Sequence, residues 1–168
     1  MNSILDLPFV GATRRNHALE HATLHVLAHK YPNRVMGGHS NPTGFFIMGD
    51  VPLDAVADAA SEALRRLRLG ERDLAIHPGC GTNLATSALL GATFGWLVMR
   101  GARSTLGHLL RLPLALAFAL LGMALSRPLG PLLQQKFTTD ADMGELRLRE
   151  VRHSLRGRLT AHRVITAS

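Results

Sequence analysis

Two apolar stretches in the middle of the chain constrain the fold more than any other feature. No Asp, Glu, Lys or Arg occurs in residues 74–99, and residues 112–126 form a second, shorter stretch. A membrane span needs about 20 mostly apolar residues, and the second stretch reaches this length if Arg111 extends its head to the lipid headgroups. A buried helical hairpin is the alternative, but a 168-residue chain has little other material to cover it. We therefore expect a transmembrane two-helix hairpin over residues 82–133.

Small residues recur every four positions in the first stretch, at Ser87, Gly91 and Gly95. In a lipid bilayer this spacing lets two helix backbones approach closely. We favour the second stretch of the same chain as the partner of this stripe. A homodimer through the same three residues is the alternative.

Basic residues indicate the orientation of the hairpin. Those near its outer ends are Arg65, Arg66, Arg68, Arg72, Arg127 and Lys136. The connecting loop holds three, Arg100, Arg103 and Arg111. The excess at the outer ends favours a cytoplasmic location for them. The first 15 residues have neither a charged start nor a long apolar core, so we expect no signal peptide among them. We expect an integral membrane protein with both termini in the cytoplasm.

Turn and periodicity signals predict the structure on either side of the hairpin. Residues 1–81 predict a small α+β domain, with helices near 13–30 and 52–69 and short strands at 34–39, 45–49 and 74–77. Residues 134–168 form a basic C-terminal segment in which 146–154 and 158–166 predict a β-hairpin. The expected fold class is thus α+β, with a cytoplasmic domain, a transmembrane hairpin and a C-terminal β-hairpin.

Four histidines recur every four residues on the first predicted helix, at His17, His21, His25 and His29. At 100° per residue they span about 120° of the helix surface, apart from its apolar face. Two histidines at i and i+4 can bind one metal ion together. For His25 and His29 the alternative is a polar helix face exposed to water.

Residues 17–21 read His-Ala-Leu-Glu-His. This H-x-x-E-H string resembles the motif of the inverzincin metallopeptidases. The resemblance implies that His17 and His21 bind zinc and that Glu20 is the general base that activates a water molecule. Helix geometry agrees, because Glu20 lies about 80° to one side of the direction of the metal, beside the ion and off the ligand axis. Glu20 could instead pair with a neighbouring basic residue.

A third ligand is expected from a loop. Inverzincins take theirs from a Glu on a later helix, but Glu62 falls opposite the apolar stripe of its helix and predicts a surface charge. His77 and Cys80 have the x₂ spacing that lets a tight turn aim both side chains at one ion, and imidazole with thiolate suits zinc. His39, beside a Gly-Gly turn, is a further candidate. An ordinary turn with a buried thiol is the alternative for the first pair, and turn hydrogen bonding for His39. Iron is the alternative to zinc.

Three segments occur in a fixed order before the apolar stretches: HALEHATLH, GHSNPTGF and HPGCGTN. This order resembles a family of small bacterial membrane proteins that has no assigned activity. The resemblance implies a membrane location and favours treating the three segments as one site.

Composition excludes other classes. One cysteine excludes an intrachain disulfide. Basic residues are scattered and only one Trp and one Tyr are present, so we expect no nucleic-acid partner.

Two functions from different classes remain. The first is a membrane-anchored zinc hydrolase, a metallopeptidase acting on a peptide or protein. The second is a non-catalytic membrane assembly or interaction protein with a structural metal or none. An open coordination position favours the first, and a closed four-ligand site the second.

Overall fold

The computed structural model describes residues 4–156 and 159–167. Contacts divide the chain into two compact units, the first formed by Met1–His77 with Gln135–Ser168 and the second by Pro78–Gln134. The second unit is therefore inserted into the sequence of the first. From the sequence, residues 1–81 and 134–168 are predicted to be separate parts of the chain. The structure instead joins the two, because the C-terminal strands pair with an N-terminal strand.

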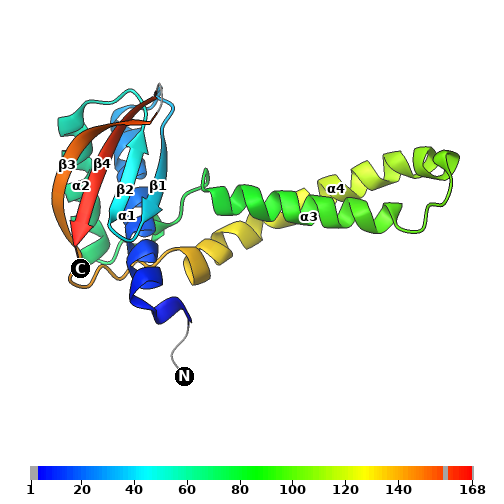
Figure 1. The fold of residues 1–168 in the computed structure, drawn as a ribbon, viewed down its shortest axis with the longest axis horizontal. Helices are drawn as coiled ribbons and strands as arrows, with labels where there is room; N and C mark the ends of the chain where they lie inside the picture. The colour runs from blue at the N-terminus through cyan, green and yellow to red at the C-terminus, as the bar shows by residue number, and fades with distance from the viewer. Residues whose placement is uncertain (1–3, 157–158, 168) are drawn as a thin grey trace. The chain divides into compact units, whose positions relative to one another are not determined.

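The first unit contains a four-stranded antiparallel sheet in the order β1-β2-β4-β3 (Figure 1). The strands are β1 (Gly37–Asn41), β2 (Gly44–Met48), β3 (Arg147–Arg156) and β4 (Leu159–Ala167). β2 and β4 form the centre, where Phe45 pairs with Val164 in the register. The turn between β3 and β4 lies outside the described residues. The α+β class is confirmed, and the expected C-terminal hairpin completes the N-terminal sheet.

Two helices, α1 (Pro8–Lys30) and α2 (Leu53–Arg68), cover one face of this sheet (Figure 1). A short 3-10 helix, η1 (Ile4–Asp6), precedes α1. Pro8 stands at the start of α1, where its missing N–H costs nothing, so the helix begins earlier than expected. Tyr31 ends it before Pro32. The core between helices and sheet includes Leu19, Leu27, Phe45, Ile47, Val56 and Val164.

The prediction of a strand at residues 74–77 is wrong. The chain forms a 3-10 helix there, η2 (Arg72–Ala75), in which the N–H of Leu74 donates to the carbonyl oxygen of Glu71 at 3.2 Å. The N–H of Ile76 likewise donates to the carbonyl of Asp73 at 3.1 Å. A three-residue apolar run does not distinguish a strand from a helical turn by periodicity. These local bonds leave the carbonyl groups of Ala75 and Ile76 to accept from side chains.

The second unit is a hairpin of α3 (Gly81–Met99) and α4 (Thr105–Leu133), followed by a π-helical turn, η3 (Gln134–Thr138). Glycines allow the two helices to approach closely. A Cβ added at Gly91 would lie 2.9 Å from Met123 Cγ, and one at Gly122 would lie 2.6 Å from the carbonyl oxygen of Leu90. The stripe of small residues thus contacts α4 of the same chain, which is the partner that we favoured.

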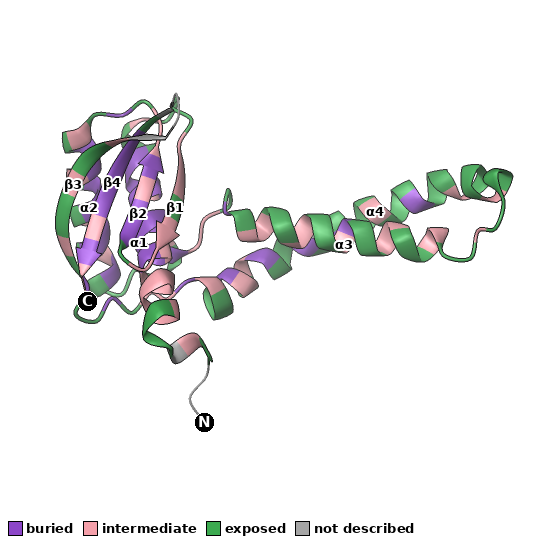
Figure 2. Cartoon of the chain, in the orientation of Figure 1, coloured by how far each residue is buried: buried purple, intermediate pink, exposed green. Residues whose placement is uncertain are grey.

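The surface of the second unit is apolar. Figure 2 shows exposed residues along most of α3 and α4, and among them Leu84 is 74% and Leu110 72% exposed. In the part of the chain that the structure describes, one helix is long and apolar enough to cross a membrane by length and composition. It spans Thr105–Thr138 and its most apolar window has a mean hydropathy of 1.9.

Candidate metal centre

Four histidine rings lie together in the first unit. His17, His21 and His25 follow one face of α1, and His77 comes from the segment after η2. The ring centres are 4.3 Å apart for His17 and His21, 5.6 Å for His21 and His77, and 4.9 Å for His25 and His77. Two imidazoles on one tetrahedral zinc ion place their ring centres about 5 Å apart. Each of these three ring pairs is therefore spaced as two imidazoles on one ion would be.

Backbone carbonyl groups orient the rings of α1. The Nδ1 atom of His17 lies 2.9 Å from the carbonyl oxygen of Thr138, and that of His21 lies 2.7 Å from the carbonyl oxygen of Ala75. A carbonyl only accepts, so both Nδ1 atoms carry the proton and the lone pair of each ring is on Nε2. In metal-binding histidines, the ring nitrogen that does not bind the metal usually donates its proton to such a carbonyl or carboxylate.

His25 has the opposite arrangement. Its Nε2 atom lies 2.8 Å from the carbonyl oxygen of Ile76, which puts the lone pair on Nδ1. We considered an exposed polar helix face for His25 and His29. His29 is exposed, whereas His25 is half-buried against the ring of His77. The four-residue spacing between His21 and His25 indicated that both rings lie on one face of the helix. Nothing in the sequence indicated that Ile76 and His77 lie beside His25.

The imidazole of His77 is neutral at physiological pH. Burial lowers the pKa of its imidazole to about 4, and the neighbouring His25 and His21 contribute to the lowering. At neutral pH the ring is therefore uncharged, and a metal ion would bind it without displacing a proton.

Glu20 is buried on the side of α1 that faces β1, with 4% of its surface exposed. Its carboxylate accepts a hydrogen bond from the hydroxyl of Ser40. The carboxylate also occupies the space beside Gly38, where an added Cβ would overlap with it. Gly38 and Ser40 are two residues apart and share one face of β1. Sequence reasoning missed both as partners of Glu20, although they flank a candidate that it named, His39.

The remaining predicted residues are His39, Cys80 and Glu62. His39 is exposed and points to the face of β1 opposite Gly38 and Ser40, so the structure does not bring it to the cluster. Cys80 is buried at the start of α3, in the second unit, where its Sγ accepts from the N–H of Thr82 at 3.5 Å. Glu62 pairs with Arg65, with 2.7 Å between Oε1 and Nη2, and this hydrogen bond lowers the pKa of its carboxyl. It is the surface charge that the helix pattern predicted.

The sequence of this chain matches a known protein family and a known relative. A family described as a domain of unknown function (DUF6391) matches residues 12–151. The chain belongs to the DUF6391 family. It is also 36% identical, over 157 residues, to an uncharacterised protein of Picosynechococcus sp. (strain ATCC 27264 / PCC 7002 / PR-6), and this match covers 82% of the chain and 74% of that protein. No solved structure matches.

The DUF6391 match extends over the four histidines of the cluster and over both helices of the second unit. The resemblance to a family without an assigned activity is thereby confirmed. The family description supplies no reaction.

Proposed function

We propose that this protein is a membrane-anchored zinc-dependent hydrolase in which His17, His21 and His77 hold the ion. The observation that carries the proposal is the pair of carbonyl groups that fix the Nδ1 protons of His17 and His21. With the proton on Nδ1, both rings have their lone pair on Nε2, on the same face of α1. Three neutral imidazoles are a donor set that suits a catalytic zinc ion and leaves its fourth position for water or substrate.

Glu20 is the proposed general base. Zinc, when bound, would supply a Lewis acid that polarises the substrate and lowers the pKa of a water molecule. The Glu20 carboxylate accepts the proton of the attacking water and passes it to the leaving group. The hydroxyl of Ser40 holds this carboxylate in place, and Gly38 leaves room for it. The H-x-x-E-H resemblance suggests a peptide or protein as the substrate.

A second candidate function has an observation in its favour. The ring of His25 lies 4.9 Å from that of His77, and its Nδ1 could supply a fourth nitrogen. Cys80, three residues after His77 in the sequence, is a sequence-based candidate for the same position. Either ligand would close the coordination sphere, and the protein would then be a non-catalytic membrane assembly or interaction protein with a structural metal.

The membrane anchor is the hairpin of α3 and α4. Residues 78–134 contain no Asp or Glu, and most of their large apolar side chains are exposed. Arg111 and Arg127 are about 24 Å apart along α4, about 6 Å less than the hydrocarbon core, so their long side chains would have to extend to the headgroups on either side. At the loop end the guanidinium carbon of Arg100 lies 5.4 Å from the centre of the Trp96 ring, a pair suited to the membrane interface. We propose that both helices cross the bilayer, with both termini in the cytoplasm.

Glu20→Gln tests the proposed reaction. Gln keeps the shape of the side chain and can still hydrogen bond to Ser40, but it cannot accept the proton of water. We expect the zinc content of the purified full-length variant, measured by elemental analysis, to equal that of the wild type. Hydrolysis of a fluorogenic peptide library should fall by about 10²–10⁴-fold. Glu62→Gln is the matched control, because Glu62 is a surface carboxylate paired with Arg65.

Other results would change the assignment. Loss of zinc in Glu20→Gln would make Glu20 a ligand, and full activity would exclude it as the base. Wild-type protein without metal would overturn the hydrolase. Loss of zinc in His25→Ala, with no hydrolysis by the wild type, would support the closed structural site instead.

A further inference from the structure

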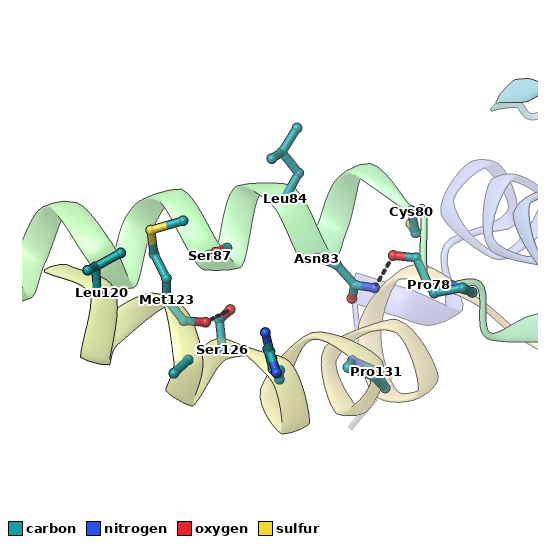
Figure 3. Close-up of a pocket in the computed structure, with 12 residues that line it drawn as sticks. Pro78, Cys80, Asn83, Leu84, Ser87, Leu120, Met123, Ser126 and Pro131 are labelled. Atoms are coloured by element: carbon teal, nitrogen blue, oxygen red, sulfur yellow. Dashed lines mark hydrogen bonds between the residues drawn. The ribbon is translucent and has the colours of Figure 1, made fainter. Parts of the chain in front are cut away.

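A cavity of about 750 Å³ lies within the second unit, between the start of α3 and the end of α4 (Figure 3). Its volume is within the range of about 300–1,000 Å³ that is typical of small-molecule sites. Asn83 lines it from α3, and Met123 and Ser126 line it from α4 (Figure 3). The cavity belongs to the helical hairpin alone and shares no residue with the four-histidine cluster.

The walls of this cavity continue into the apolar surface of the hairpin. Leu84, Leu120 and Met123 line it, and they are 74%, 57% and 46% exposed. These side chains therefore face the cavity and the surroundings of the helices at once. With α3 and α4 in a bilayer, the surroundings are acyl chains, so a hydrocarbon chain can enter the cavity from the side.

The polar side chains of the cavity bond within the hairpin. Asn83 donates from Nδ2 to the carbonyl oxygen of Pro78 at 2.9 Å, and its Oδ1 accepts from Gln134 Nε2 at 2.7 Å. Ser126 donates to the carbonyl oxygen of Met123 at 2.6 Å. The hydroxyl of Ser87 also lines the cavity, and the guanidinium of Arg127 is the one charged side chain among the described residues that line it.

The charge of Arg127 favours an anionic ligand. Residues 78–134 contain no Asp or Glu, so no carboxylate of the second unit can neutralise it. For the same reason nothing in this unit would attract the ammonium group of a zwitterionic headgroup. A guanidinium donates two parallel hydrogen bonds to one anionic group. Both a carboxylate and a phosphate ester accept such a pair well.

We propose that the cavity binds one anionic phospholipid, with its phosphate at Arg127 and one acyl chain along Leu84, Leu120 and Met123. This inference rests on the membrane placement given under the proposed function and does not use the metal centre. It assigns the hairpin a ligand in addition to its role as an anchor.

Lipid binding to the purified full-length protein in detergent tests the inference. Native mass spectrometry counts the phosphatidylglycerol or phosphatidylcholine molecules retained per chain. We expect the wild type to bind one phosphatidylglycerol about fivefold more tightly than phosphatidylcholine, the preference that one interfacial arginine supplies. Arg127→Gln should abolish this preference, and Ala124→Phe, which fills the cavity, should reduce retention of both lipids. Ala124 lines the cavity and is exposed, so the larger ring does not enter the contact between the helices.

Arg111→Gln is the matched control. Arg111 is on the same helix, but its guanidinium donates to the carbonyl oxygen of Arg100 at 2.9 Å, at the loop end of the hairpin. This variant should keep the wild-type preference. Equal phosphatidylglycerol retention by the wild type, Arg127→Gln and Ala124→Phe would overturn the proposal. Oleate that binds in place of phosphatidylglycerol would also overturn it, in favour of a free fatty acid.

Extraction of membranes with alkaline carbonate separates the two proposals. Protein released into the supernatant would refute the membrane anchor itself. Protein that stays in the membrane but shows no lipid preference would refute the lipid site alone. Zinc content, measured in the same samples, reports independently on the metal centre.

Discussion

The Nδ1 atom of His21 lies 2.7 Å from the carbonyl oxygen of Ala75. Ala75 is the last residue of η2, and the 3-10 turn leaves its carbonyl without a strand partner and directed at α1. The hydrogen bond fixes which nitrogen of His21 carries the lone pair. A strand at residues 74–77 would have used such carbonyl groups in a sheet. The local turn is therefore what connects this segment to the candidate metal centre.

His21→Ala should abolish zinc binding, whereas His29→Ala should not. His29 is on the same helix face and is exposed, so its removal tests whether any histidine of the series suffices. The loss in affinity for His21→Ala should exceed the 10–100-fold that is typical for a lost outer-shell partner. Isothermal titration of the metal-free protein with zinc measures it. Equal affinity of the two variants would contradict a specific centre.

Gly38→Ala should destabilise the protein by about 1–3 kcal/mol, because the new methyl group overlaps with the buried Glu20 carboxylate. Gly37→Ala is the control. A Cβ there meets only Met48 Cε, at 4.0 Å, and alanine is favoured over glycine in a strand by about 0.5–1 kcal/mol. Urea unfolding of the full chain in detergent, followed by circular dichroism, gives both values. If Gly38→Ala is as stable as Gly37→Ala, Glu20 does not occupy that space.

The stability of the protein should fall as the pH drops below 6.5, in part through His162. His162 is fully buried and donates from Nε2 to the carbonyl oxygen of Val51 at 2.8 Å. Burial lowers its pKa, the bond to Val51 partly offsets this, and the neighbouring His153 lowers it further. Below pH 6.5 the unfolded chain therefore binds a proton that the folded chain resists.

His162→Gln should reduce this pH dependence, because the amide can still donate to Val51 but does not titrate. His153→Gln, at the exposed neighbour, should retain most of it. Urea unfolding between pH 5 and 8 measures the slope. An unchanged slope in His162→Gln would exclude His162 as a source of the pH dependence.

A membrane-impermeant maleimide should label Ala102→Cys in intact cells and should not label Ser61→Cys. Ala102 lies in the loop between α3 and α4, and Ser61 is exposed on α2. Ala102 is a better position than Ser104, whose Oγ caps α4 by accepting from the N–H of Gly107 at 3.1 Å. The native chain controls for Cys80, which is buried. Labelling of Ser61→Cys in intact cells would overturn the cytoplasmic location that we propose for the first unit.

The sequence was informative wherever a feature depends on one element alone. The spacing of His17, His21 and His25 puts them on one face of a helix regardless of what surrounds it. The stripe around Gly91 likewise follows from the four-residue period. Such patterns are local, and the structure retains them because α1 and α3 are regular helices.

Features that depend on distant partners could not be predicted. The pairing of Phe45 with Val164 joins strands from opposite ends of the chain, and no periodicity reports it. In β1, one residue of register decides that Ser40 faces Glu20 and His39 faces away. The carbonyl of Thr138, which orients His17, comes from η3, over 100 residues further along the chain.

The position of β4 at the centre of the sheet has a consequence for biosynthesis. β2 ends at Met48, but β4, which pairs with it at the centre of the sheet, begins at Leu159. About 110 residues are therefore synthesised before this pairing can form, which takes roughly 5–20 s at the usual rates of translation. Both helices of the hairpin are synthesised within this interval. With α3 and α4 in the bilayer, the chain is tethered before the sheet can close. Under the proposed membrane placement, the histidine-bearing unit would fold at the membrane surface after insertion, and it would acquire any metal ion there.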